Sequence, residues 1–337
     1  MSEERFSPEF RRDPITSEWV VLAAGRGKRP GAPEPAVTET QPEEQCPFCP
    51  GHEMETPPEI SACREEEGRD CPGWTVRVFP NKFPILVSQV PGAGAEQSFS
   101  PDLKPALGTS EVIVDTPEHG EPPWMRGPAQ VLDMLNTYRD RILAMKEEGR
   151  TAYVHIIRNH GLAAASSLPH PHSQLYGLPF IPSLIDMELD GFAQSRPGEL
   201  SCILCDIVLK EIESGERLIS LSENFIAFSP FASRLPYESW IVPRRHEMRF
   251  EECEHLPEMA EMMTGLLMRY HERLGDPAFN YWIHTYPLHG ELRPFHWHLE
   301  ILPRTTMLGG LEMGAGVWVN IVAPESAARL LRAVSPQ

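Results

Sequence analysis

The 337-residue sequence contains no long hydrophobic run. No apolar stretch approaches the roughly 20 residues that a helix needs to span a bilayer, so we expect no membrane contact. The segment MSEERFSPEFRRDP at the start also lacks the apolar core of a secretory signal. These absences predict a cytoplasmic protein. In that compartment, CxxC pairs bind metal or carry out redox chemistry more often than they form structural disulfides.

Positive charge is scarce in this chain. It has 30 Lys and Arg against 48 Asp and Glu, which gives a net charge of −18. A non-specific nucleic-acid binder needs a basic face that neutralises phosphates, so we expect no nucleic-acid partner. A small phosphorylated substrate needs only a few local Arg, Lys or backbone N–H groups, and the composition allows one.

The most informative pattern is two CxxC pairs, each followed by two histidines at nearly matching distances. The two histidines are 51 residues apart in the first set and 50 apart in the second, and each set ends in His-x-His. A module therefore occurs twice, and each copy carries the ligands of a tetrahedral zinc site. The predicted ligands are Cys46, Cys49, His119 and His170 in the first copy, and Cys202, Cys205, His246 and His296 in the second.

Strand and helix patterns recur in the same order in both halves. The apolar spacing predicts a helix over 128–148 in the first half and over 256–274 in the second, and a last helix over 324–333. The 35 prolines predict short elements and many loops. We predict an α+β fold of two related antiparallel sheets, each with a helix on one side. A cluster of Gly, Ser and Pro near 190–200, which includes Gly191, places the division between domains 1–195 and 196–337.

Other ligand sets are open at both sites. His52 is an alternative to His119, and a redox role is disfavoured because the first CxxC pair lies in a proline-rich loop and does not open a helix. In the second half, a nitrogen and oxygen site for iron or zinc would compete with the cysteines for His296. Four protein ligands leave no open coordination position, so we expect structural metals. The competing set is Glu188, His284, His296 and His298.

The run HPHSQ at 170–174 has the densest set of reactive side chains. The intervening Pro171 favours an extended backbone, so His172 and Gln174 share one face of a strand. If a metal holds His170, it also fixes His172 close by. A neutral imidazole is a good nucleophile toward phosphorus, and a nearby amide can bind a phosphoryl oxygen as charge moves onto it. The second copy has Glu300 in place of Gln174. A carboxylate repels phosphate, so we expect only the first copy to react.

This HPHSQ run resembles the active-site motif of galactose-1-phosphate uridylyltransferases, a branch of the histidine-triad superfamily. The similarity covers most of the chain. It includes the strand at 19–21, an arginine loop with Arg26 and Arg29, the segment 77–83 and the loop 159–167. The resemblance implies two tandem histidine-triad-like halves, in agreement with the duplication. It also implies a homodimer in which the arginine loop reaches the partner's site.

The resemblance further implies a reaction. His172 attacks the α-phosphorus of UDP-glucose and releases glucose-1-phosphate, which leaves a uridylyl-histidine. Galactose-1-phosphate then takes the uridylyl group in a ping-pong reaction whose halves are nearly isoenergetic. Gln174 would bind the α-phosphoryl oxygen. Further substrate contacts are implied for Arg26, Arg29, Asn81, Asn159, Ser167 and Glu312.

Two alternative functions are open. Many members of the family have Gly where this chain has Ser173. Ser at that position also occurs in relatives that act on ADP-sugars or use phosphate as acceptor, so an ADP-sugar phosphorylase is the second hypothesis. The third hypothesis is a zinc-stabilised binding protein without catalytic activity, which would form no nucleotidylated intermediate.

Overall fold

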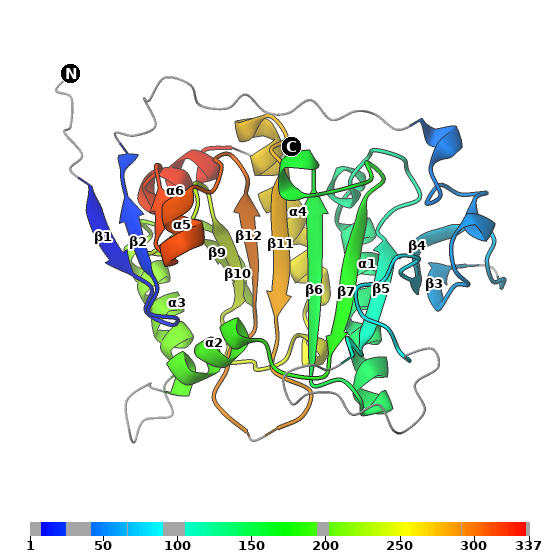
Figure 1. The fold of residues 1–337 in the computed structure, drawn as a ribbon. Coiled ribbons are helices and arrows are strands. Elements are labelled where there is room, and N and C mark those ends of the chain that lie inside the picture. The colour runs from blue at the N-terminus through cyan, green and yellow to red at the C-terminus, as the bar shows by residue number, and fades with distance from the viewer. Residues whose placement is uncertain are drawn as a thin grey trace.

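The computed structural model describes residues 8–24, 42–65, 67–89, 105–193, 202–290 and 292–334. Its centre is one antiparallel sheet of ten strands (Figure 1). In spatial order the strands are β3 (Ser61–Arg64), β4 (Trp74–Pro80), β5 (Thr109–Val114), β7 (His172–Leu178), β6 (Tyr153–His160), β11 (Phe279–His284), β12 (His298–Pro303), β10 (Ser239–Pro243), β9 (Phe225–Phe228) and β8 (Leu218–Leu221).

The two sheets predicted from the sequence are halves of this single sheet. The strands from β3 to β6 belong to the first copy of the module, and the strands from β11 to β8 belong to the second. They join where β6 pairs antiparallel with β11, with Ile157 opposite Trp282. This pairing satisfies backbone groups that two separate sheets would leave unpaired at their edges. The α+β class with two related halves is confirmed, and the halves share one continuous sheet.

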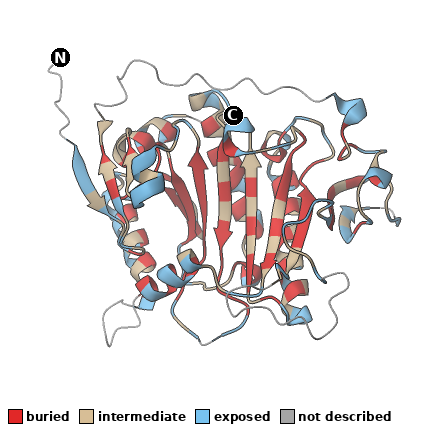
Figure 2. Cartoon of the chain, in the orientation of Figure 1, coloured by how far each residue is buried: buried red, intermediate tan, exposed pale blue. Residues whose placement is uncertain are grey.

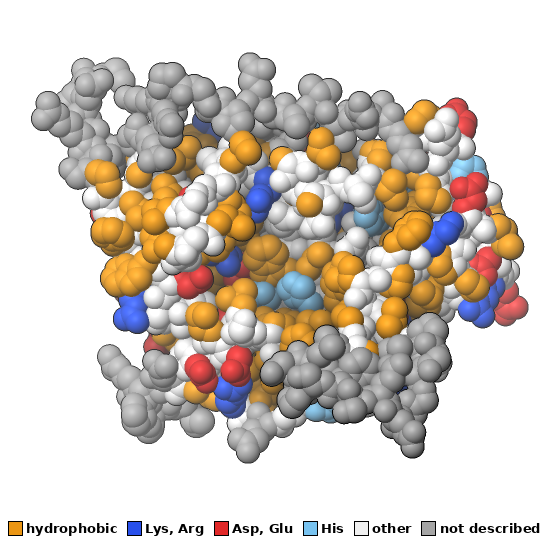
Figure 3. All heavy atoms as spheres, in the orientation of Figure 1, with side chains coloured by type: hydrophobic (Ala, Val, Ile, Leu, Met, Phe, Trp, Pro, Cys, Tyr) orange, Lys and Arg blue, Asp and Glu red, His pale blue; other side chains and the backbone are white. Residues whose placement is uncertain are grey.

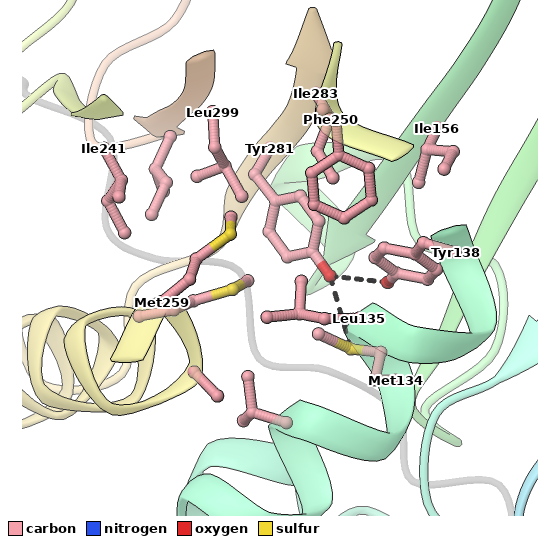
Figure 4. Packing of buried hydrophobic residues seen from close by; sticks show 14 of the residues in the cluster. Met134, Leu135, Tyr138, Ile156, Ile241, Phe250, Met259, Tyr281, Ile283 and Leu299 are labelled. Carbon is pink, nitrogen blue, oxygen red and sulfur yellow. Dashed lines mark hydrogen bonds between the residues drawn. The ribbon is translucent and has the colours of Figure 1, made fainter. Parts of the chain in front are cut away.

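Two long helices cover one face of the sheet. α1 (Pro128–Glu148) and α4 (Leu256–Leu274) lie side by side behind it and span the predicted ranges (Figure 1). Each has a proline in its first turn and ends at a glycine in the left-handed conformation, Gly149 or Gly275. Their apolar faces form one core with the strands, in which Tyr138 of α1 meets Tyr281 of β11 (Figure 4).

The opposite face of the sheet is covered unevenly. β9, β10 and β12 are buried along their whole length, whereas β6 and β7 alternate between buried and half-buried residues (Figure 2). A small sheet of β1 (Glu9–Arg12), β2 (Trp19–Leu22) and β13 (Trp318–Asn320) lies over the second half. Residues between Asp13 and Val20 line a small cavity together with Arg234 and Glu300. The first half therefore keeps the more open face.

The described ranges also contain four shorter α-helices: α2 (Ser183–Ala193), α3 (Ile203–Ser214), α5 (Gly310–Ala315) and α6 (Pro324–Arg332). Of these, only α6 was predicted. Gly191, which we assigned to a linker, lies inside α2, and a Cβ atom there would lie 2.0 Å from the carbonyl oxygen of Ile15. This glycine therefore permits close packing of two segments.

The predicted division between 195 and 196 falls within 194–201, outside the described residues, and stays a prediction. Across the described ranges, none of the helices combines the length and the hydropathy that crossing a bilayer requires.

Candidate active site and metal centres

His172 is the first residue of β7 and has 7% of its surface exposed, on the face opposite α1 and α4. Its Nδ1 lies 2.8 Å from the carbonyl oxygen of His170. A carbonyl oxygen only accepts hydrogen bonds, so Nδ1 carries the proton and Nε2 keeps its lone pair. Burial, aided by the positive charge of Arg158, lowers the pKa of His172 to about 4. The imidazole is therefore neutral at pH 7, and Nε2 can act as a nucleophile.

Two amide side chains share the face of His172. Gln174 lies two residues along β7, and Asn159 of β6 comes one residue beyond the pair Arg158 and Ser173, where the register continues toward His172. The Tyr176 hydroxyl donates to Gln174 Oε1, and Asn280 Nδ2 donates to Asn159 Oδ1 at 2.8 Å. Among the described residues, neither amide NH2 group has a hydrogen-bond partner. Both groups are left to donate to an anion. Histidine side chains are visible near the middle of this face (Figure 3).

The other predicted substrate residues are placed unevenly. Asn81 follows β4, and its Oδ1 accepts from the backbone N–H two residues on, at 2.9 Å. Ser167 is exposed in the loop that leads to β7. Glu312 caps the N-terminus of its own helix, α5, which packs against β13 and not beside β7 (Figure 1). Arg26 and Arg29 lie outside the described residues. The substrate roles of all five stay predictions.

The first predicted metal-ligand set comes together around Cys46, Cys49, His119 and His170, whose ligand atoms all lie within 4.8 Å of one another. Distances from Sγ to Nδ1 are 3.3, 3.5 and 3.6 Å. A tetrahedral zinc ion, with bonds of about 2.3 Å to sulfur and about 2.1 Å to nitrogen, holds such atoms about 3.6 Å apart. His170 Nε2 donates to a backbone carbonyl at 2.9 Å, which leaves the Nδ1 lone pair facing the sulfurs. His52 bonds a backbone carbonyl through Nδ1 and is not in the group, so it does not replace His119.

The second set, Cys202, Cys205, His246 and His296, forms a group of the same kind. Its Sγ to Nδ1 distances are 3.5, 3.7 and 3.7 Å. Nε2 of His296 donates to a backbone carbonyl at 3.0 Å, as in the first group. Cys202 is also the N-cap of α3, a position that favours a thiolate. The donor set and the spacing fit a tetrahedral zinc ion here too.

A third group of candidate ligands lies near the second site and does not include His296. Glu300 takes the place of that histidine, and the members are Glu188, His284, His298 and Glu300. Nδ1 of His284 lies 2.9 Å from Glu188, and Nε2 of His298 lies 3.4 Å from Glu300. All four are buried, and one carboxylate oxygen of Glu188 and Nε2 of His298 have no hydrogen-bond partner among the described residues. Unsatisfied buried polar atoms in a group whose ligand atoms all lie within 4.8 Å of one another fit a metal ion bound by nitrogen and oxygen.

The second His-x-His is built differently from the first. His298 is 1% exposed, and the ring of Trp240 stacks on it with centroids 4.8 Å apart. Glu300 accepts from Trp282 at 2.9 Å and pairs with Arg234. His298, the counterpart of His172, is thus a member of a buried group of candidate metal ligands and does not lie at an open surface.

We did not predict the polar residues behind β7. Ser173 points away from His172, and its hydroxyl donates to Asp115 at 2.8 Å and contacts the Tyr138 hydroxyl. Asp115 also pairs with Arg158, and both side chains are almost fully buried. The alternation of side chains along β7 places Ser173 on the helix side and Tyr176 on the open side. No pattern in the sequence indicates that Asp115 and Arg158 lie behind Ser173, or that Asn280 lies beside Asn159.

Comparison with known proteins gives a consistent result. Residues 1–182 match the sequence family described as galactose-1-phosphate uridyl transferase, N-terminal domain. ADP-glucose phosphorylase from Arabidopsis thaliana is 31% identical over 347 aligned positions, which cover 99% of this chain and 95% of that protein. Galactose-1-phosphate uridylyltransferase from Thermotoga maritima is 29% identical over 336 positions, which cover 96% and 98%. A crystal structure of the Arabidopsis ADP-glucose phosphorylase with bound ADP-glucose has a TM-score of 0.84 at 30% identity, over 98% of this chain and 100% of that one.

Proposed function

Because this chain belongs to the galactose-1-phosphate uridylyltransferase family, we propose that it transfers a nucleoside monophosphate from a nucleotide sugar through a covalent nucleotidyl-His172. One observation carries the proposal. The hydrogen bond from Nδ1 of His172 to the carbonyl of His170 leaves a lone pair on Nε2. That is the form of histidine that attacks phosphorus. His172 lies on the face of the sheet that is incompletely covered.

In the first half-reaction, Nε2 of His172 bonds to the α-phosphorus. The bond from that phosphorus to the oxygen of the sugar phosphate breaks, and a sugar-1-phosphate leaves with the electron pair. The NH2 groups of Gln174 and Asn159 donate to the non-bridging oxygens as negative charge develops on them. In the second half-reaction an acceptor oxygen displaces the imidazole. The Nδ1 proton stays on His172 throughout, in its hydrogen bond to His170.

The substrates that we propose are UDP-glucose as donor and galactose-1-phosphate as acceptor, as the family match suggests. A second candidate is ADP-glucose as donor with inorganic phosphate as acceptor. It is favoured by the 31% identity to the Arabidopsis ADP-glucose phosphorylase and by the TM-score of 0.84 to its structure. Both reactions use the same covalent step and differ in the base and in the acceptor.

We also propose zinc at the two groups of two cysteines and two histidines, and iron or zinc at the group of Glu188 and Glu300 with two histidines. When bound at the first group, zinc would fix His170 and, through the extended chain, the imidazole of His172. Its role is structural because four protein ligands leave no open position. By family resemblance, the active form is a homodimer in which Arg26 and Arg29 reach the partner's site, with Asn81, Ser167 and Glu312 as further substrate contacts.

Mass spectrometry of the protein after incubation with UDP-glucose or ADP-glucose tests the proposal. We expect an added nucleoside monophosphate on the peptide that contains His172, and the added mass identifies the base. His172→Gly should form no adduct, whereas His289→Gly, at an exposed loop histidine, should behave as the wild type. Release of the adduct by galactose-1-phosphate or by inorganic phosphate then identifies the acceptor. If the wild type forms no adduct with either donor, the chain is a binding protein and the proposed chemistry is wrong.

A further inference from the structure

We propose that Tyr176 is a positioning residue that decides which end of the Gln174 amide faces the reacting phosphoryl group. The inference rests on the function proposed above. His172, Gln174 and Tyr176 occupy alternate positions of β7 and so project from one face of the strand. The Tyr176 hydroxyl donates to Oε1 of Gln174.

A glutamine amide has two ends of opposite character. Its NH2 end donates hydrogen bonds, and its oxygen only accepts them. The residues that flank Gln174 in the neighbouring strands are Val112 and Ile157, and neither offers a polar side chain. Among the described residues, Tyr176 is therefore the hydrogen-bond partner of this amide, and although a phenol hydroxyl can also accept, here it donates to Oε1. With Oε1 engaged by the phenol, the NH2 end is directed to the anion. The reverse orientation would turn a carbonyl dipole against a phosphate.

The Tyr176 hydroxyl is suited to act as a donor. The residue is half-buried, and burial raises the pKa of its phenol, so the proton is present at neutral pH. Asn159 follows the same arrangement, because its oxygen accepts from Asn280 and its NH2 end is left over. Asn280 Nδ2 also donates to a backbone carbonyl at 2.9 Å, which holds this second pair in place.

The second copy of the module lacks this arrangement. The residue two positions beyond Glu300 is Leu302, which has no hydroxyl, and Glu300 is held by Trp282 and Arg234. A carboxylate has two equivalent oxygens and needs no such orientation. Of the two copies, only the first has a hydroxyl donor at this position, and it lies beside the amide that would contact a phosphate. The fold that the two copies share therefore does not require the donor.

The test is a double-mutant cycle on the rate constant for nucleotidyl-His172 formation, measured in single turnovers with whichever of UDP-glucose and ADP-glucose labels the wild type. Tyr176→Phe should slow this step roughly three- to tenfold, the bias that one hydrogen bond gives to a choice between two orientations. Binding of the nucleotide sugar should change less than the rate. In a Gln174→Ala background, Tyr176→Phe should have no further effect.

Tyr270→Phe is the matched control, because it removes a buried phenol that donates to the backbone of Tyr237 on the helix side of the sheet. It should alter stability and leave the rate constant unchanged. An equal loss from Tyr176→Phe with and without Gln174 would show that Tyr176 acts otherwise and would overturn the inference, as would an unchanged rate. If neither nucleotide sugar forms an adduct on the wild-type protein, the proposed covalent function itself is refuted. That measurement is made before any variant is tested.

Discussion

The buried ion pair behind β7 supplies a quantitative prediction. Asp115 and Arg158 have side-chain exposures of 0% and 1%, and the carboxylate also accepts from Ser173 at 2.8 Å. Removing one member leaves an uncompensated buried charge, which costs about 3–5 kcal/mol. The second half shows that the site tolerates apolar residues, because the strand register puts Ile283 and Leu299 where the first half has Arg158 and Ser173. We therefore expect Arg158→Met to destabilise strongly and Arg158→Met with Asp115→Asn to recover most of the loss.

This loss of folding free energy can be expressed as a decrease in melting temperature. An unfolding entropy of about 2.1 cal/mol/K per residue amounts to about 0.7 kcal/mol/K for the 337 residues. The single variant should then melt about 4–7 °C below the wild type in calorimetry at matched metal content, and the double variant within about 2 °C of it. Equal melting temperatures for the single and double variants would refute the reasoning, because the cost would not come from the unpaired carboxylate.

The pH dependence follows from the same pair. Burial raises the pKa of Asp115 to about 6 even beside Arg158, and loss of the guanidinium raises the pKa further. The folded state then holds a proton that the unfolded carboxyl, with a pKa of about 3.9, has lost, so stability falls as pH rises. The difference in melting temperature between Arg158→Met and wild type should widen from about pH 5.5 to about pH 8. A constant difference over that range would contradict the assignment of the cost to Asp115.

Two further predictions concern the metals and the packing of the N-terminal segment. Elemental analysis should find one metal ion for each of the three groups. Cys49→Ser, Cys205→Ser and Glu188→Gln should each remove one ion, and a content unaffected by Glu188→Gln would refute metal binding at the third group. Gly191→Ala should destabilise by at least about 1–3 kcal/mol, the usual cost of overpacking, because its Cβ would lie 2.0 Å from the carbonyl oxygen of Ile15. Limited proteolysis should then cut between β1 and β2 faster than in the wild type, and unchanged cleavage would show that the segment does not depend on this contact.

The sequence predicted what depends on local spacing. The helices Pro128–Glu148 and Leu256–Leu274 carry apolar residues at helical intervals, and both were found at the predicted bounds. The two cysteine and histidine groups were predicted because their ligands recur at matching intervals. The proton position on the His172 imidazole could not be predicted from residue spacing, because it depends on a hydrogen bond to a backbone carbonyl.

Features that depend on contacts between distant segments were not predicted. The pairing of β6 with β11 joins residues more than a hundred positions apart, and no periodicity marks it. Gly191 looked like a linker residue because its neighbours in the sequence suggested one, but its role is set by Ile15. The sequence placed His296 in the third candidate group, whereas the structure has Glu300 there because His296 faces the cysteines.

The duplicated module explains why one half is available for chemistry and the other is not. Both halves place a histidine two residues beyond a histidine that faces two cysteines, and both orient it through Nδ1 toward a backbone carbonyl. The halves differ in what covers the sheet. The segment that links β1 to β2 lies over Glu300, and Trp240 stacks on His298, so the second imidazole is enclosed. An enclosed imidazole beside carboxylates binds a cation better than it attacks an anionic phosphate. The same backbone geometry therefore suits both the proposed nucleophile, on a partly covered face, and the proposed metal ligand, under a fully covered one. We infer that the cover, not the motif, decides between the two roles.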